Sequence, residues 1–397
     1  MSTARHLTRV LVIARKFWPH ADDGCLRLLQ LLDGWRSRGI EATVLTARWH
    51  SQWPERAMLR ECQLHRLLPS PRSNWNESQF QKNVVSWIGK HVDEFDAIYV
   101  DRADGLLAAI AAKCGKWNKP LVTRFSLEGE IEGIARNQQV SPVMAAEACR
   151  RTDVVVVPNS FAQRVLLSHG FDERKIINIP DTVEGCVPRD LDSRNRAASA
   201  LFDVSSDFVI PGRTDLLLHL GTADAKSLVT ATRTVCEMLD QGASLRMWII
   251  NPGQSTQAVY DQVKNRGWHR EILLFDAFDD LEELVAVADL AIVSNPDATL
   301  QFSVPLMLNS ELPMVIAESV ESKNLHPETP LMKYYDSQES LQRQLKDWLV
   351  HRQQWLTEAM GLRASDRRHR PHQRSLDQWE SLYGNLANSS DGMRSRG

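Results

Sequence analysis

The sequence predicts an α/β protein built from two doubly wound, Rossmann-like domains, each with a parallel sheet, that face each other across a cleft. Three observations favour this fold. Short apolar runs alternate with segments of helical periodicity along most of the chain. The polar and irregular stretch 184–214 interrupts this alternation, as a connection between domains would. The length of 397 residues suits two large domains.

The N-terminal segment has the pattern of a strand, a helix and a second strand. Residues 9–14 form an apolar run, 25–38 have helical periodicity, and 41–46 form another apolar run. Gly39 suits the left-handed conformation that ends many helices. Because both runs are apolar throughout, we expect parallel pairing in a sheet covered on both faces.

The remaining elements follow the same alternation. In the first domain, strands are predicted at 97–100, 120–123 and 153–157, with helices at about 79–93, 104–117, 142–151 and 160–170. In the second domain, strands are predicted at 215–220, 244–250, 272–275, 290–293 and 313–317, with a helix between each pair. The domains are therefore placed at 1–183 and 215–365, joined by the connection 184–214.

The C-terminal part is predicted to return to the first domain. Helical periodicity between 337 and 386 is broken by the basic segment 363–374, whose charge density and Pro371 indicate a crossing loop. A closing helix at about 375–388 is assigned to the first domain, and 388–397 is expected to be a frayed tail.

Composition excludes several classes of protein. Lys and Arg number 47 against 50 Asp and Glu, so the formal charge of −3 provides no basic field for nucleic acid. The six cysteines form no C-x-x-C pair and no metal-ligand spacing with histidine, which predicts reduced thiols and no metal site. His-Glu-x-x-His, G-x-S-x-G and EF-hand patterns are also absent from the sequence.

The N-terminus lacks the pattern of a signal peptide, and no apolar run approaches the roughly 20 residues that span a bilayer. We therefore expect a cytoplasmic protein, with peripheral contact at the inner membrane face left open. The basic segment 363–374 would suit anionic lipid or an acidic partner, and the favoured alternative is a solvated crossover loop.

Ligands of open parallel sheets bind outside the carboxyl ends of the strands, so the connections after each strand hold the candidate residues. After the first strand, Gly24 opens a helix whose N-terminal N–H groups suit an anion or a hydroxyl. The alternative is that Asp22 or Asp23 simply caps that helix. After the first strand of the second domain, Gly221 to Lys226 resembles a P-loop without its second glycine. Lys226 would meet a diphosphate as a point charge, or would be an ordinary solvated lysine.

The order of elements, taken with several motifs, resembles a GT-B retaining glycosyltransferase of family 4, also called glycosyl transferases group 1. The matching motifs are Phe17-Trp-Pro with Asp23-Gly24, Arg38-Gly-Ile-Glu-Ala-Thr-Val-Leu-Thr46, Pro158-Asn-Ser160, Ala286-Val-Ala-Asp-Leu-Ala-Ile-Val-Ser294 and Leu312-Pro-Met-Val-Ile-Ala317. The resemblance covers nearly the whole chain.

The sequence departs from this family at the positions that carry function. Gly221-Thr222 replaces Gly-Arg, Phe125 stands near the position of a histidine, and Asp181-Thr182 replaces Asn-Gly. The two glutamates of the family, which have seven residues between them, correspond to Ala298 and Leu306. Asp297 or Gln301 would compensate if the register of that loop slips. The resemblance therefore implies a degenerate donor site.

The resemblance implies transfer of a sugar from a nucleotide-sugar donor to a glycan or a lipid-linked acceptor, with retention if the protein is active, in polysaccharide biosynthesis. The alternative is a non-catalytic GT-B protein that binds a glycan or a partner glycosyltransferase. The implied residues are Asp297 for catalysis, Gly221, Thr222, Lys226, Ser294 and Thr299 for the donor, and His20, Asp23, Gly24 and Arg124 for the acceptor. No metal is expected, and no cofactor apart from the nucleotide-diphosphate sugar as substrate.

Aromatic residues suggest one more contact surface. Trp49, Trp53 and Trp75 fall in the segment expected to lie on the acceptor side. Their rings would stack on sugars or rest on lipid head groups, and the alternative is ordinary packing.

Overall fold

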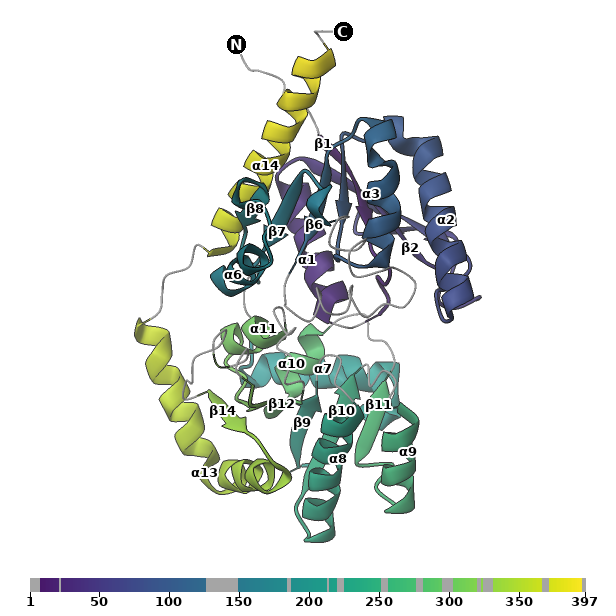
Figure 1. Cartoon of the computed structure of the whole chain (residues 1–397). Coiled ribbons are helices and arrows are strands. Elements are labelled where there is room, and N and C mark those ends of the chain that lie inside the picture. Colours follow the sequence, from purple (N-terminus) through teal and green to yellow (C-terminus); the bar gives the residue numbers. More distant parts are fainter. Residues whose placement is uncertain are drawn as a thin grey trace. The chain divides into compact units, whose positions relative to one another are not determined.

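A computed structural model describes residues 8–20, 23–125, 149–183, 187–212, 214–219, 225–250, 256–275, 281–294, 303–319, 323, 331–365 and 371–394. The chain divides into two units. The first comprises Met1–Phe17, Leu28–Asp181 and Arg370–Gly397, and the second comprises Trp18–Arg27 and Thr182–His369. The predicted fold class, α/β with two parallel-sheet domains, is confirmed (Figure 1).

Within the described residues, the first unit contains a sheet of eight strands in the order β3-β4-β2-β1-β5-β6-β7-β8. The strands are β1 (Thr8–Ile13), β2 (Ile40–Ala47), β3 (Arg56–Leu59), β4 (Cys62–Leu67), β5 (Ala97–Val100), β6 (Leu121–Arg124), β7 (Val154–Val157) and β8 (Ile176–Asn178). All neighbours pair in parallel except β3 and β4, which form an antiparallel hairpin. The order reverses between β1 and β5, which is the topological switch point of this sheet.

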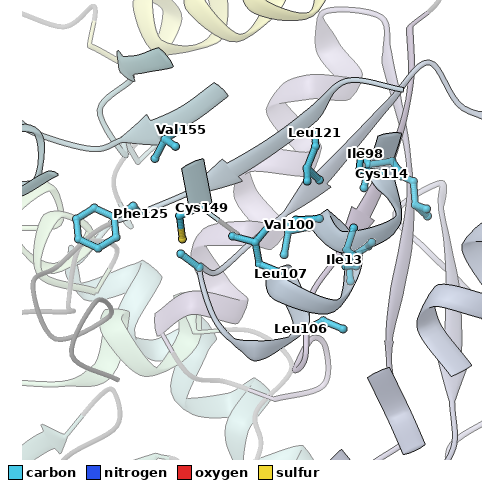
Figure 2. Packing of buried hydrophobic residues seen from close by; sticks show 14 of the residues in the cluster. Ile13, Ile98, Val100, Leu106, Leu107, Cys114, Leu121, Phe125, Cys149 and Val155 are labelled. Carbon is cyan, nitrogen blue, oxygen red and sulfur yellow. The ribbon is translucent and has the colours of Figure 1, made fainter. Parts of the chain in front are cut away.

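One face of this sheet packs against α2 (Asn74–His91), α3 (Gly105–Trp117) and α6 (Ser160–Ser168). Side chains alternate along a strand, so Leu11 and Ile13 of β1 point to this face. Figure 2 shows Ile13, Val100 and Leu121 from the strands gathered with Leu107 from α3. Burial of this continuous apolar surface is the main stabilising contribution to the unit.

The other face packs against α1 (Asp23–Ser37) and α14 (Pro371–Arg394). The fully buried ring of Trp35 lies 5.1 Å, centroid to centroid, from Trp379 and from Tyr383 of α14, and 5.5 Å from Tyr99 of β5. A Cβ at Gly34 would lie only 2.5 Å from Cδ2 of Leu376, so glycine permits this close approach of the two helices.

The basic segment 363–374 is not simply a crossing loop. Helix α13 (Gln338–Ser365) extends into it, and α14 begins at Pro371, the first helical position that proline favours. The predicted frayed tail 388–397 is also wrong in part, because α14 continues to Arg394. The sequence pattern predicted this helix at the correct place, about 375–388, but α14 is longer at both ends.

Within the described residues, the second unit contains a sheet of six parallel strands in the order β11-β10-β9-β12-β13-β14. The strands are β9 (Asp215–His219), β10 (Leu245–Ile250), β11 (Ile272–Phe275), β12 (Leu290–Val293), β13 (Met314–Ala317) and β14 (Met332–Tyr335). Its topological switch point lies between β9 and β12. One face packs against α8 (Ala225–Asp240), α9 (Thr256–Asn265) and α13, and the other against α7 (Leu191–Val204), α10 (Glu282–Val287) and α11 (Ser303–Asn309).

The segment 184–214 is not an irregular connection. It contains α7 and the short 3₁₀ helix η3 (Ser206–Phe208), and α7 packs against α10. The Asp190 side chain accepts a hydrogen bond from the backbone N–H of Ser193 and so caps α7. Only Ala197 and Leu201 are buried along this helix, which is why its sequence is so polar. Two further 3₁₀ turns, η1 (Val92–Glu94) and η2 (Glu173–Lys175), precede β5 and β8.

The predicted strands of both sheets are present, and four strands were not predicted. These are β3, β4, β8 and β14, all at or next to a sheet edge, where partly exposed positions hide the apolar run. Most of the helix predicted at 142–151 lies outside the described residues. Among the helices that the structure describes, none is both long enough and apolar enough to cross a lipid bilayer.

Candidate functional site

The carboxyl edge of the first sheet is occupied by charged residues. Arg15 follows β1 and Asp101 follows β5, so the two stand at the switch point. The backbone N–H of Asp101 donates to the carbonyl of Ile13 over 2.9 Å, which extends the strand pairing to this edge. The hydroxyl of Tyr99 donates to Oδ1 of Asp101 over 3.2 Å.

Two further carboxyl groups lie near Arg15. Nη2 of Arg15 lies 2.7 Å from Oε2 of Glu77, whose side chain is buried. Burial raises the pKa of Glu77, and the charge of Arg15 opposes that effect. Asp104 caps α3 by accepting hydrogen bonds from the N–H groups of Leu106 and Leu107, and burial raises its pKa as well. Carboxyl groups with raised pKa values at the ligand-binding edge of a sheet are candidates for proton transfer.

Arg124 ends β6, and its guanidinium donates to both carboxylate oxygens of Asp181. The arginine and aspartate side chains are 7% and 14% exposed, so this is a buried, bidentate ion pair within the first unit. Arg124 was predicted to bind the acceptor, and the structure shows that much of its hydrogen-bonding capacity is directed at Asp181. Phe125, which stands near the family's histidine, is 1% exposed and belongs to the apolar core.

The other predicted acceptor residues fall in the segment Trp18–Arg27, which groups with the second unit. His20 is half-buried and makes a single β-bridge pair rather than part of a strand. Asp23 and Gly24 are the first two residues of α1. The helix therefore begins at Asp23, close to the predicted start at Cys25. The assignment of these residues to an acceptor stays a prediction.

The switch point of the second sheet carries a buried pair of polar side chains. His219 ends β9 and Ser294 follows β12, and Nε2 of the imidazole lies 2.6 Å from the hydroxyl oxygen of the serine. Each residue is 1% exposed. Burial lowers the pKa of His219 to about 4, so the ring is neutral at pH 7. No hydrogen-bond partner for Nδ1 of His219 exists among the described residues.

Ser294 was predicted from the sequence and His219 was missed. The sequence did offer a signal for His219, which is a polar residue inside the apolar run 215–220. A polar side chain buried in a strand needs a hydrogen-bond partner, so such a residue is a candidate for a functional role. Lys226, another predicted donor residue, is exposed in the first turn of α8, the helix that follows β9. Gly221, Thr222, Asp297 and Thr299 lie outside the described residues, as do Ala298 and Gln301.

Leu306, which the resemblance described above aligns with a glutamate, lies in α11 and is 7% exposed. It belongs to the apolar core of the second unit together with Val304, Met307 and Leu312. This leucine therefore serves packing, and its side chain provides no hydrogen-bond acceptor for a ligand.

A cavity of about 230 Å³ lies in the first unit. It is lined by α1, the hairpin β3–β4, the first half of β2, and Phe17 from the connection after β1. Over the described ranges, no cluster of three or more His, Cys, Asp or Glu side chains could hold a metal ion.

Comparison with known proteins agrees with this architecture. Residues 27–184 match the model of Glycosyltransferase Family 4. No curated protein sequence matches the chain. The fold is similar to that of sucrose-phosphate synthase from Thermosynechococcus elongatus, with 12% identity, a TM-score of 0.67, and coverage of 98% of this chain and 100% of that one.

Two further structures are complexes. HepE of Anabaena with UDP and glucose has 14% identity and a TM-score of 0.66, covering 95% of this chain and 99% of that one. The catalytic domain of starch synthase IV from Arabidopsis thaliana, bound to ADP and acarbose, has 12% identity and a TM-score of 0.65, covering 96% and 99%. The chain thus has the fold of GT-B glycosyltransferases over nearly its whole length.

Proposed function

We propose that this protein is a glycosyltransferase that takes a sugar from a nucleoside-diphosphate donor and transfers it to a glycan or a lipid-linked acceptor. The observation that carries the proposal is the polar switch point of the second sheet. His219 and Ser294 lie at the carboxyl ends of β9 and β12, and Lys226 lies in the first turn of the helix that follows β9. Open parallel sheets bind nucleotides at this place.

The chemistry of these groups suits a diphosphate. The first turn of α8 presents backbone N–H groups, and its dipole favours negative charge. Lys226 adds a compact positive charge at the same helix end. The neutral imidazole of His219 either accepts from or donates to the Ser294 hydroxyl, which fixes the orientation of that hydroxyl.

The first unit supplies groups for the acceptor side. Glu77 and Asp104, with raised pKa values, and the paired Arg15 provide proton-exchanging and positively charged groups at the switch point of the first sheet. Retention of configuration, a hexose as the transferred sugar, a role in polysaccharide assembly and an acceptor role for His20, Asp23, Gly24 and Arg124 are parts of this proposal.

A second candidate function is a non-catalytic protein that binds a glycan or a partner glycosyltransferase. The burial of Leu306 in the core favours it, because a leucine there cannot accept the ribose hydrogen bonds that the family resemblance assigns to a glutamate. A hydrogen bond to a charged group contributes roughly 1.5–3 kcal/mol, so its loss would weaken nucleotide binding by about ten- to a hundredfold.

Titration calorimetry with UDP, GDP, ADP and their glucose conjugates, followed by an assay for release of the nucleoside diphosphate, distinguishes the two functions. The proposal predicts binding of one nucleotide and slow hydrolysis of its sugar conjugate. Lys226→Ala should weaken that binding about tenfold at low salt, and less at high salt, because the contact is electrostatic. Lys346→Ala, an exposed lysine on α13, is the matched control and should bind as the wild type does. Glycan binding without any nucleotide binding would establish the second function instead.

A further inference from the structure

The cavity of the first unit is lined by apolar side chains together with a group of charged ones. Leu29 and Leu32 line it from α1. Ile40, at the start of β2, and Leu59, at the end of β3, line it from the sheet. An apolar cavity of about 150 Å³ is large enough for the six carbons of benzene. At about 230 Å³, this cavity therefore has room for roughly nine non-hydrogen atoms.

Two ion pairs beside the cavity connect α1 to the turn between β3 and β4. Nη1 of Arg60 lies 2.6 Å from Oδ2 of Asp33, and Nη1 of Arg36 lies 3.2 Å from Oε2 of Glu61. Nη1 of Arg36 also donates to the carbonyl of Arg60 over 3.1 Å. Asp33 and Arg36 share a face of α1 with Leu29, because they follow it by four and seven positions. All four charged side chains line the cavity.

Arg60 and Glu61 occupy a turn that does not favour them. Both have a positive φ, 47° and 66°, in a two-residue connection of the kind that favours Asn-Gly. A positive φ destabilises the backbone of residues that carry a Cβ, so this turn is less stable than one built from Asn and Gly. The side chains that the sequence retains there are the hairpin members of the two ion pairs. The turn thus places a guanidinium and a carboxylate beside the cavity.

Glu61 is the most loosely held of the four charged side chains. Its side chain is 81% exposed, against 27% for Asp33. An ion pair this open to water contributes little to stability, so another anion can replace Glu61 on Arg36. Both contacts of Arg36 use Nη1, and no acceptor among the residues that the structure describes takes a hydrogen bond from its Nε or Nη2. That edge of the guanidinium matches the two oxygens of a carboxylate.

We propose that this cavity binds a small carboxylic acid with an apolar body, such as an aliphatic chain of about six to eight carbons. The carboxylate of the ligand takes the place of Glu61 on Arg36. Its chain lies against Leu29, Leu32 and Leu59, and each methylene removed from water strengthens binding by about fourfold. The proposal does not depend on donor binding by the second unit.

The charges around the cavity favour an anion over a cation. Asp33 is held by Arg60 and is mostly buried, so a cation would have to displace a closely held partner. Glu41 also lines the cavity, but its side chain belongs to the opposite face of β2 from that of Ile40, because side chains alternate along a strand. The thiol of Cys62 donates to a main-chain carbonyl, and burial raises its pKa to about 12, so it provides no thiolate for a cation.

Titration calorimetry of the full chain with octanoate tests the proposal. We expect octanoate to bind at least about tenfold more tightly than octanol or octylamine, which have the same chain and no carboxylate. Affinity should rise about fourfold per methylene from butanoate to octanoate and then level off towards dodecanoate, because the cavity is full. Bound octanoate should slow amide exchange in peptides that cover 28–37 and 56–64.

Three variants identify the group that holds the carboxylate. Arg36→Gln should weaken octanoate binding about tenfold, to the level of octanol. Glu61→Gln should strengthen it about two- to fivefold, because this substitution removes the competing carboxylate. Arg56→Gln, an exposed arginine of β3 outside the cavity lining, is the matched control and should bind as the wild type does.

Two results would overturn the proposal directly. One is equal affinity for octanoate and octylamine, and the other is wild-type octanoate binding by Arg36→Gln with a native circular dichroism spectrum. A steady rise in affinity up to dodecanoate, without slower exchange in 56–64, would show detergent-like binding elsewhere on the chain and would also contradict the proposal.

Discussion

Among the described residues, the buried ion pairs of the two units lie at opposite edges of their sheets. In the first unit, Arg15, Glu77 and Asp101 gather at the carboxyl edge, where ligands of such sheets bind. In the second unit, the ionic network lies at the amino edge, around Asp215 at the start of β9 and Asp289 just before β12. Among the described residues, the carboxyl edge of that sheet carries the neutral pair of His219 and Ser294.

The ionic network at the amino edge of the second sheet connects α7 and α13 to the sheet. Arg352 of α13 donates to Asp215 and to Asp289 over 2.5 Å each, and Arg194 of α7 donates to Asp289 over 2.8 Å. The second oxygen of Asp289 accepts from the backbone N–H of Leu216 over 2.8 Å. One buried carboxylate thus joins two helices on opposite faces of the sheet.

The two edges of the second sheet differ in what their polar groups do. The ion pairs at the amino edge stabilise the fold, whereas the groups at the carboxyl edge stand where a ligand would bind. Charges at the amino edge of the second sheet are satisfied by one another and hold the fold. At the carboxyl edge of that sheet, the described residues include the uncharged pair of His219 and Ser294 and the helix end near Lys226, where the charge of a ligand would be favourable. The following variants test this division.

Asp289→Ala should have the largest effect. The substitution leaves two arginines and a backbone N–H without their shared acceptor, and breaking a buried pair from one side costs about 3–5 kcal/mol. Urea unfolding followed by circular dichroism measures the change. Asp261→Ala, an exposed carboxylate on α9, is the control and should change the free energy of unfolding by less than about 0.5 kcal/mol. A loss below about 1 kcal/mol for Asp289→Ala would show that the network is not a structural clamp.

His219 should make the protein unstable in acid. Its pKa is about 4 in the folded state, below the ordinary value of 6.5, so the unfolded state binds the proton first as the pH falls. The contribution of this group to stability is complete above about pH 6.5 and is lost between pH 6.5 and 4, by up to about 3 kcal/mol.

His219→Gln removes that titration and keeps a partner for Ser294, so its free energy of unfolding should fall less than that of the wild type between pH 6.5 and 4. His351→Gln, half-exposed on α13, is the matched control and should still lose stability between pH 6.5 and 4, because His219 is intact in this variant. Identical pH profiles for the wild type and His219→Gln would contradict the assignment of a neutral, buried imidazole at this switch point.

Glu77→Gln should have the smallest effect, and in the opposite direction. Burial raises the pKa of Glu77 in the folded state, so its stabilising contribution is present below its unfolded pKa and is lost as the pH rises through its folded pKa. At pH 7 the variant should be as stable as the wild type or up to about 1 kcal/mol more stable. Glu94→Gln, an exposed partner of His91, serves as the comparison. A variant clearly less stable than the wild type would mean that the Arg15 pair outweighs burial.

The central strands of both sheets could be predicted because such strands are apolar on both faces, as in 153–157 and 290–293, whereas β3, β4, β8 and β14 at or next to the edges could not. Helix α7 could not, because only two of its side chains reach the core. The ion pair of Arg124 with Asp181 could not be predicted, because the two residues are 57 positions apart in the sequence and a local pattern cannot indicate such a contact. Ser294 and Lys226 could be chosen as candidate site residues from the sequence, because ligands of parallel sheets bind at the connections after strands. The burial of Leu306 could not, because it depends on how α11 packs against the sheet.

Hydrogen exchange with and without nucleotide tests the central claim most directly. We expect that the nucleotide identified by calorimetry slows amide exchange in peptides that cover 219–228 and 294–303, at the carboxyl ends of β9 and β12. Exchange in 281–289, at the amino edge, should be unchanged. Protection confined to the first unit, or a bound nucleotide that protects neither of these two segments, would contradict the placement of the donor in the second unit.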